Sequence, residues 1–79
     1  MADFEIKKTL DFKGLACPMP IVKTSMEMPK ISVGDVVEVL TTDPGSIADF
    51  PAWAKTTGNA VLEIKQEPGL IRIYIKRQK

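Results

Sequence analysis

The residue with the most reactive side chain is Cys17, which lies in the segment 14–20 with the sequence GLACPMP. A helix is expected to begin directly after it, where unpaired backbone N–H groups and the positive end of the helix dipole favour a thiolate. The two prolines of this segment carry no N–H, so only Met19 and Ile21 remain as donors in the first turn. We therefore expect the pKa of the thiol to be modestly lowered.

Three residues are expected to shape the loop that carries the thiol. Gly14 suits a turn, while Pro18 and Pro20 fix their φ angles near about −65° and so stiffen the junction between loop and helix. A stiff junction would hold the sulfur in one direction. The alternative is that Cys17 is a small apolar residue at a helix start, since free cysteines are often buried and inert.

The composition limits what this thiol can do. The 79 residues include no histidine and one cysteine, which excludes Ser-His-Asp and Cys-His arrangements, an N/S-ligated zinc site, an intrachain disulfide and a Cys-x-x-Cys pair. A lone thiolate can still attack a sulfane sulfur and keep the transferred atom as a persulfide, a reaction that requires access but no added base. We expect neither a metal nor an organic cofactor.

The apolar pattern around this segment predicts β-α-β-α-β-β, with strands over 5–11, 35–42, 59–66 and 71–76 and helices over 18–28 and 45–57. In the first strand, Ile6 and Leu10 are expected to point the same way. The first helix has an apolar spacing of i, i+3 and i+7, formed by Met19, Val22 and Met26.

The second helix carries a proline in its interior. Asp43 followed by Pro44 is a helix-start signal, with the carboxylate as the cap. Pro51 then implies either a kink or a late start near Asp49. The helical spacing of the apolar residues places Phe50 and Trp53 in the core.

This element order predicts a single domain over 1–79, a two-layer α/β (α+β) sandwich. Right-handed crossovers place both helices on one face of a four-stranded mixed sheet and leave the other face open to solvent or a partner. We expect the first two strands to be neighbours, while the pattern leaves the order of the final hairpin open.

Charge and hydropathy argue against a membrane or a polyanion as the main partner. Eleven basic and ten acidic residues give a net charge of +1, which creates no strong global field. No stretch approaches the roughly 20 apolar residues of a membrane helix, and the N-terminus has no signal-peptide core. We expect a cytoplasmic protein in a reducing compartment.

The chain resembles the TusA/SirA family of small sulfur carriers. The resemblance lies in Leu10-Asp11 with the GLACPMP segment, which matches the Cys-Pro-x-Pro signature, in the block 42–53, in 57–59 and in the closing hairpin. It implies strand order 1-2-4-3 and a Cys17 that accepts sulfur as a persulfide. A cysteine desulfurase or a rhodanese-like protein would be the donor, and a downstream protein the acceptor, in tRNA thiolation, molybdenum-cofactor supply or sulfur oxidation. In this sense the chain would be a sulfurtransferase.

Three positions depart from the family pattern. Met19 stands where some carriers that serve tRNA thiolation have an acidic residue between the prolines, and Ala16 replaces a basic residue often found before the cysteine. Ala54 occupies a position where some members have a further cysteine. These changes leave the chemistry of Cys17 intact and bear on the choice of donor and acceptor.

Four residues near the thiol are candidate partner contacts. Met19 would contact a partner because methionine adapts to varied surfaces. Lys23 could steer acidic partners, although a solvated helix face is the favoured interpretation. Asp43 and Pro44 are expected mainly to start the second helix, with a partner contact left open because their loop should share a sheet edge with the thiol.

Two further functions stay open at this stage. The chain could be a non-catalytic binding or regulatory module that uses the open sheet face or the basic C-terminal segment 72–79, where an RNA phosphate contact is possible but secondary to a solvated strand face. It could also be a selenium-related carrier, since the same thiolate would serve.

Overall fold

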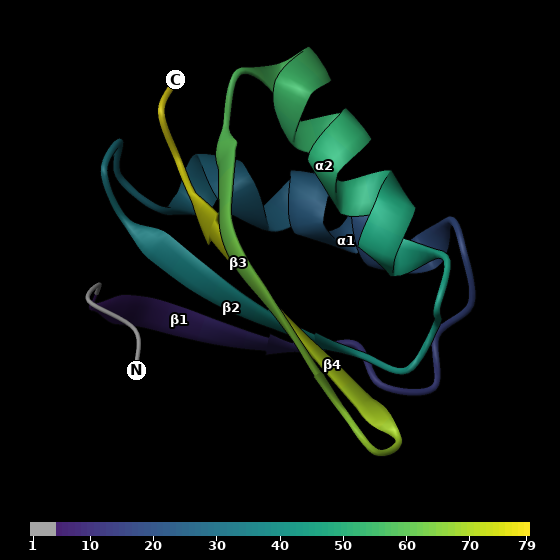
Figure 1. The fold of residues 1–79 in the computed structure, drawn as a ribbon. Coiled ribbons are helices and arrows are strands. Elements are labelled where there is room, and N and C mark those ends of the chain that lie inside the picture. Colours follow the sequence, from purple (N-terminus) through teal and green to yellow (C-terminus); the bar gives the residue numbers. More distant parts are fainter. Residues whose placement is uncertain (1–4) are drawn as a thin grey trace.

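The computed structural model describes residues 5–79, so residues 1–4 of the expected domain lie outside the described residues. The elements follow the predicted order (Figure 1): β1 (Ile6–Asp11), α1 (Met19–Glu27), the 3-10 turn η1 (Met28–Lys30), β2 (Val36–Thr41), α2 (Ser46–Thr57), β3 (Ala60–Glu67) and β4 (Leu70–Lys76).

The four strands form one mixed sheet in the order β1-β2-β4-β3. β1 and β2 are parallel, whereas β4 pairs antiparallel with both β2 and β3. Both helices cover the same face of this sheet (Figure 1). The predicted two-layer α+β sandwich is therefore confirmed, as is the strand order that the resemblance implied.

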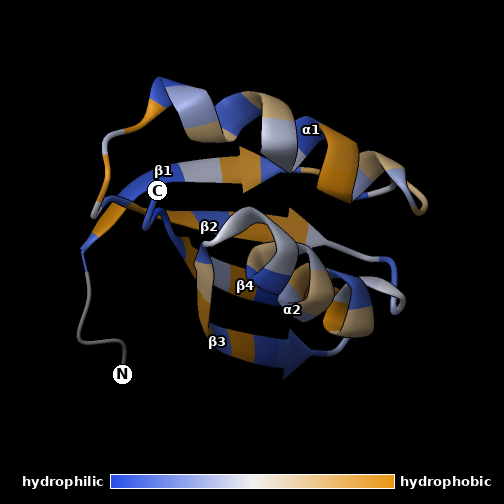
Figure 2. Ribbon diagram, turned by 90° about the horizontal axis from the view of Figure 1, so that it is seen from above, coloured by the Kyte–Doolittle hydropathy of each residue, from blue (hydrophilic) through white to orange (hydrophobic). Residues whose placement is uncertain are grey.

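The core lies between the central strands and the helices. Alternate residues of β2 and β4 point into it, and hydrophobic residues recur along both strands (Figure 2). Five side chains at its centre are fully buried, namely Val37, Val39, Phe50, Ile73 and Ile75. The period of two follows from the pleat of a strand, which sends successive side chains to opposite faces.

The expectation that Ile6 and Leu10 point the same way is wrong. Ile6 pairs with Val36 and Leu10 with Val39, and the register shifts between Ile6 and Lys8. This irregularity adds one residue to β1, which reverses the alternation on either side of it. Leu10 consequently enters the core at 5% exposure, whereas Ile6 lies on the opposite face at 36%.

The helix predicted from the spacing of Met19, Val22 and Met26 is present as α1, but these residues do not form its buried side. Met19, Val22 and Met26 are 40%, 42% and 64% exposed. The buried side of the helix is instead made by Pro20 and Thr24. Burial of Thr24 is possible because its hydroxyl donates a hydrogen bond to the Pro20 carbonyl, at 2.7 Å, and so leaves no unpaired polar group in the core.

Helix α2 continues through Pro51, so the late start near Asp49 is not observed. Phe50 is fully buried, as predicted, while Trp53 is only half-buried at the edge of the core. The indole Nε1 of Trp53 donates to Ser25 Oγ at 2.8 Å and thereby joins α2 to α1.

The sheet face away from the helices is charged. Glu38 accepts hydrogen bonds from Tyr74 at 2.7 Å, from Thr9 at 3.2 Å and from Arg72 at 3.3 Å. Burial and the neighbouring Glu38 raise the pKa of Tyr74 to about 12. Arg72 also pairs with Glu67 at 2.9 Å, so linked charged groups lie across the middle of this face.

Two methionines at the end of the first helical segment test its orientation. Met28→Ala should lower the free energy of unfolding by about 2–5 kcal/mol because Met28 is 6% exposed in the core. Met26→Ala should change it by less than about 0.5 kcal/mol because that side chain faces solvent. Urea denaturation measures both values, and equal losses would contradict the observed orientation of α1.

Candidate functional site

The thiol lies at the edge of the sheet where β1 and β2 both end. Their parallel pairing puts the loop after β1 next to the loop after β2 (Figure 1). Two hydrogen bonds join the loop after β1 to the end of β2 and to the loop that follows it: Phe12 N–H to the Leu40 carbonyl at 2.8 Å, and Gly14 N–H to Thr42 Oγ1 at 3.0 Å. The positions of β1 and β2 thus determine what surrounds Cys17.

Asp43 holds the backbone of the cysteine loop. Its Oδ2 accepts the Cys17 N–H at 2.9 Å, and its Oδ1 accepts the Gly45 N–H at 3.3 Å. The N-cap of α2 is Gly45, which makes no side-chain cap, so the prediction that Asp43 caps this helix is wrong. The carboxylate instead joins the start of α2 to the loop that bears the thiol.

Asp49 contacts the sulfur itself. The Cys17 Sγ donates a hydrogen bond to Asp49 Oδ2 at 3.1 Å. Asp49 lies in the first turn of α2, where its own N–H donates to the Gly45 carbonyl at 3.0 Å. Its carboxylate is half-buried, whereas Cys17 is exposed.

The two carboxylates lie close together around Gly45. A Cβ at Gly45 would lie 3.4 Å from Asp43 Oδ2 and 3.7 Å from Asp49 Oδ2. Both oxygens are also bonded to groups of the same cysteine. The thiol therefore lies beside two negative charges, one from the loop before α2 and one from the first turn of α2.

These charges reverse the expected direction of the thiol pKa. The pKa of Cys17 is raised, first by the hydrogen bond to Asp49, then by desolvation, and then by the negative charges of Asp49 and Asp43. A thiolate would face two anions, whereas a thiol can donate its proton to one of them. The predicted modest lowering is wrong because it considered only the helix start.

The start of α1 has fewer free backbone N–H groups to stabilise a thiolate than the sequence suggested. The N-cap of α1 is Pro18, and the Met19 N–H is already bonded to the Ala16 carbonyl at 2.9 Å. One of the two expected donors is thus used within the turn. The Cys17–Pro18 peptide bond is cis.

The predicted loop-shaping residues all lie around the thiol. Gly14 has a φ of 83°, in the left-handed region that glycine adopts without steric strain. Pro18 is the N-cap residue of α1, and Pro20 is fully buried in the first turn of that helix. Loop and helix are consequently anchored on both sides of Cys17.

The candidate partner contacts are spread over two elements. Met19 is exposed next to the thiol and begins an exposed apolar stripe that continues along α1 through Val22 and Met26. Lys23 lies on the same helix and lines a shallow hollow with Phe12, Met26 and Glu27. Pro44 is exposed in the loop before α2. Sequence reasoning identified the helical spacing of these residues and expected Met19 to contact a partner, but it did not identify the three as one exposed stripe.

Asp49 also escaped sequence reasoning, which treated it only as a possible helix start. The available signal was its place six residues after Asp43, in the first turn of a helix that was expected to begin at the same sheet edge as the thiol. An acidic residue in the first turn of a helix normally complements the dipole. Because the dipole already explains an acidic residue at this position, the sequence gives no reason to expect its contact with Cys17. That contact depends on how the segment that bears Cys17 packs against the start of α2.

The basic C-terminal segment does not form an open cationic patch. Arg72 is paired with Glu38 at 3.3 Å and with Glu67 at 2.9 Å. Arg77 donates to the backbone carbonyls of Ile31 and Lys79. Two of the four cations are thus already engaged, which weakens the case for phosphate binding by this segment.

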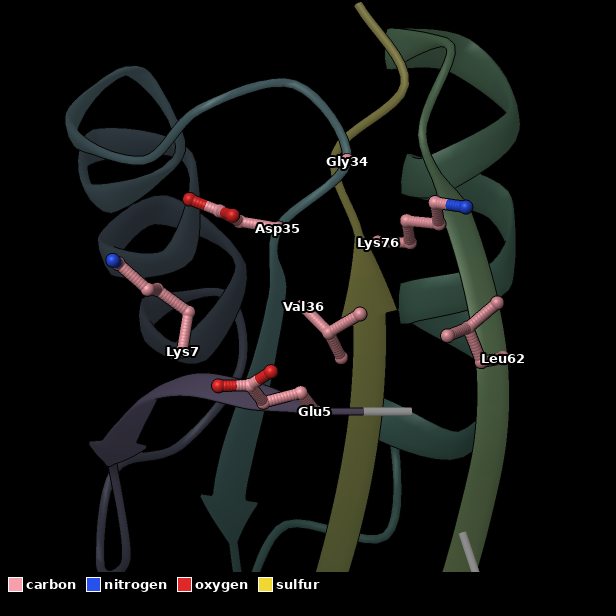
Figure 3. Close-up of a pocket in the computed structure, with 7 residues that line it drawn as sticks. All are labelled: Glu5, Lys7, Gly34, Asp35, Val36, Leu62 and Lys76. Carbon is pink, nitrogen blue, oxygen red and sulfur yellow. The ribbon is translucent and has the colours of Figure 1, made fainter. Parts of the chain in front are cut away.

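A hollow of about 350 Å³ lies where β1 and β2 begin, at the other end of these strands from Cys17. The side chains that line it include two carboxylates and two ammonium groups. In Figure 3, Val36 lies in the middle of the hollow. Glu5, Lys7 and Asp35 lie on one side of it, and Lys76 lies on the opposite side. The hollow shares no residue with the thiol site.

Neither helix within residues 5–79 is long and apolar enough to span a membrane.

Comparisons with known proteins agree on one family. The family described as Sulfurtransferase TusA matches residues 8–77. The sulfur carrier protein TusA of Allochromatium vinosum is 46% identical over 77 residues, which cover 98% of this chain and 99% of that protein. A protein of Aquifex aeolicus, named as a candidate sulfur carrier protein, is 43% identical over 77 residues, or 98% of this chain. This chain spans 39% of the length of that longer relative.

The fold has a counterpart among solved structures. The crystal structure of a SirA-like protein from Desulfitobacterium hafniense superposes with a TM-score of 0.78 at 24% sequence identity. The match covers 91% of this chain and 99% of the other. This likeness supports the β1-β2-β4-β3 sandwich.

Loss of the Asp43 carboxylate should loosen the cysteine loop without unfolding the sheet. In Asp43→Ala, the Cys17 amide should exchange its hydrogen about tenfold faster, as expected for the loss of a charged hydrogen bond worth roughly 1.5 kcal/mol. Hydrogen exchange followed by NMR measures this, with the amide of Val39 as the internal reference. Asp11→Ala is the matched control, because Asp11 also accepts a backbone N–H two residues ahead but does not contact Cys17. Equal acceleration in both variants would contradict the role of Asp43.

Proposed function

Because the chain belongs to the TusA sulfurtransferase family, we propose that it is a sulfur carrier and that Cys17 holds the transferred sulfur as a persulfide. One observation carries the proposal: the sole cysteine of the chain is exposed on a loop that is anchored from both sides. An exposed thiol can reach the sulfur of another protein, and an anchored loop presents it in one direction.

The transfer needs no reagent beyond the two proteins. The Cys17 sulfur attacks the terminal sulfur of a donor persulfide, R–S–SH, so that a new S–S bond forms on Cys17 as the donor S–S bond breaks. The donor sulfur leaves as a thiolate and takes up the proton that Cys17 gives up. The products are Cys17–S–SH and R–SH, and a second transfer of the same kind passes the sulfur to the acceptor.

A single cysteine suits a carrier. A second thiol in the same chain could attack the persulfide and release its sulfur, and the sequence contains none. The mechanism draws on no metal and no organic cofactor. In this sense the protein acts as a sulfurtransferase.

The partners are proteins that give and receive sulfane sulfur. A cysteine desulfurase or a rhodanese-like protein is the proposed donor, and a thiol protein is the proposed acceptor. Met19, Lys23, Asp43 and Pro44 are the proposed contacts, since they lie on the two elements beside the thiol. We propose a cytoplasmic location, where a free cysteine stays reduced.

The proposal predicts a mass gain confined to Cys17. Incubation with a cysteine desulfurase and cysteine, or with a rhodanese and thiosulfate, should add about 32 Da to the intact protein, because one sulfur atom is retained. Cys17→Ser should gain nothing. Intact-protein mass spectrometry without reductant measures the change, and a selenium carrier would reveal itself by a much larger increment from a selenium donor.

The same assay separates the carrier from a binding module. Arg72→Ala and Lys76→Ala should load sulfur as the wild type does, because neither residue adjoins the thiol. If the wild type takes up no sulfur while an established carrier does, the proposed function is wrong. A partner that still binds Cys17→Ser but no longer binds the Arg72 or Lys76 variant would then favour a module that uses the open sheet face.

A further inference from the structure

We propose that Asp49 is a positioning residue of the sulfur site, which holds the empty Cys17 in its protonated form and loses this contact when the cysteine is loaded. The inference rests on the proposed function, because it assigns Asp49 a part in the same transfer. Its basis is the hydrogen bond from Cys17 Sγ to Asp49 Oδ2, at 3.1 Å.

The geometry fixes both ends of this contact. The Cys17 N–H is bonded to Asp43, which holds the cysteine backbone, and the Asp49 N–H is bonded to the Gly45 carbonyl in the first turn of α2. The sulfur and the carboxylate therefore face each other from two anchored segments. A hydrogen bond to an ionised acceptor is about twice as strong as a neutral one, and this one restrains the direction of the thiol.

No cation balances the carboxylates. Within residues 5–79, neither Asp43 nor Asp49 forms an ion pair with a lysine or arginine. Lys13, from the cysteine loop, pairs with Asp11 at 3.8 Å, and Lys23 of α1 lies beside Glu27 at a separate hollow. The first turn of α1 adds no acidic residue. The charges that act on the thiol are thus the two carboxylates, both of which favour the protonated form.

Loading with sulfur changes this contact. In the empty protein, Sγ carries the proton that Asp49 accepts. After transfer, Sγ is bonded to Cβ and to the added sulfur, so it has no proton to donate. That proton has passed to the leaving thiolate of the donor, and the outer sulfur, when ionised, is repelled by both carboxylates. The empty site therefore keeps its thiol protonated until a donor arrives, whereas in the loaded site repulsion by the carboxylates favours an outer sulfur that points away from α2.

The pH dependence of cysteine alkylation tests the inference on the empty protein. Asp49→Asn should move the midpoint of the iodoacetamide rate profile to lower pH and make alkylation several-fold faster at pH 7.5, because the charge that opposes the thiolate is gone. Glu63→Gln is the matched control, since it makes the same change in net charge on β3, away from the thiol. Cys17 is the only cysteine, so the rate reports on it alone.

A measurement on the wild type covers the case in which Asp49→Asn does not fold, which circular dichroism would reveal. The alkylation midpoint of the folded wild type should lie at higher pH than that of the same protein unfolded in urea, because unfolding removes the contacts of Cys17 with Asp43 and Asp49. A profile of folded Asp49→Asn that superposes on the wild type, or a wild-type midpoint no higher than that of the urea-unfolded protein, overturns the inference. Because alkylation requires no sulfur donor, its outcome is independent of the mass assay for the proposed function.

Discussion

The parallel pairing of β1 with β2 determines the surroundings of the thiol. Parallel strands end at the same edge of a sheet, so the loops that follow them meet there. Cys17 thereby contacts Asp43 and Asp49, which lie 26 and 32 positions further along the chain. The buried valines of β2 hold this pairing in the core, and α2 continues the same edge with its first turn. The chemistry of the cysteine therefore depends on strand pairing more than on its own sequence neighbours.

Two electrostatic effects compete at the sulfur, and their sizes decide the outcome. A helix N-terminus acts as roughly half a positive charge, and its influence fades within the first turn. Here the Met19 N–H already bonds the Ala16 carbonyl, so part of that charge is satisfied locally. A full negative charge on Asp49 lies 3.1 Å from Sγ, with Asp43 close behind. The carboxylates prevail, and the resting cysteine is a thiol that a carrier can keep until a donor arrives.

Sequence reasoning succeeded where the pattern is repeated and local. The alternation of Ile71, Ile73 and Ile75 requires a strand with one buried face, and the order of elements leaves few topologies. It failed where a single inserted residue or a tertiary contact determines which way a side chain points and whether it is buried. The irregularity between Ile6 and Lys8 reverses which sheet face the side chains of β1 point to, and no feature of the composition reports it. The burial of Thr24 depends on a bond to Pro20 that no hydropathy pattern reports. Cys17 was predictable from its motif, but Asp49 was not, because its contact crosses two loops.

The most direct test of this account is an NMR titration of the wild-type protein, labelled with ¹³C at Cys17 Cβ and at the aspartate carboxyl carbons. The account predicts that Cys17 ionises at a higher pH than an ordinary cysteine, and that the Asp49 carboxyl signal moves in the same step because it loses the shared proton. A thiol that ionises below the ordinary cysteine value, with no response from Asp49, would contradict it.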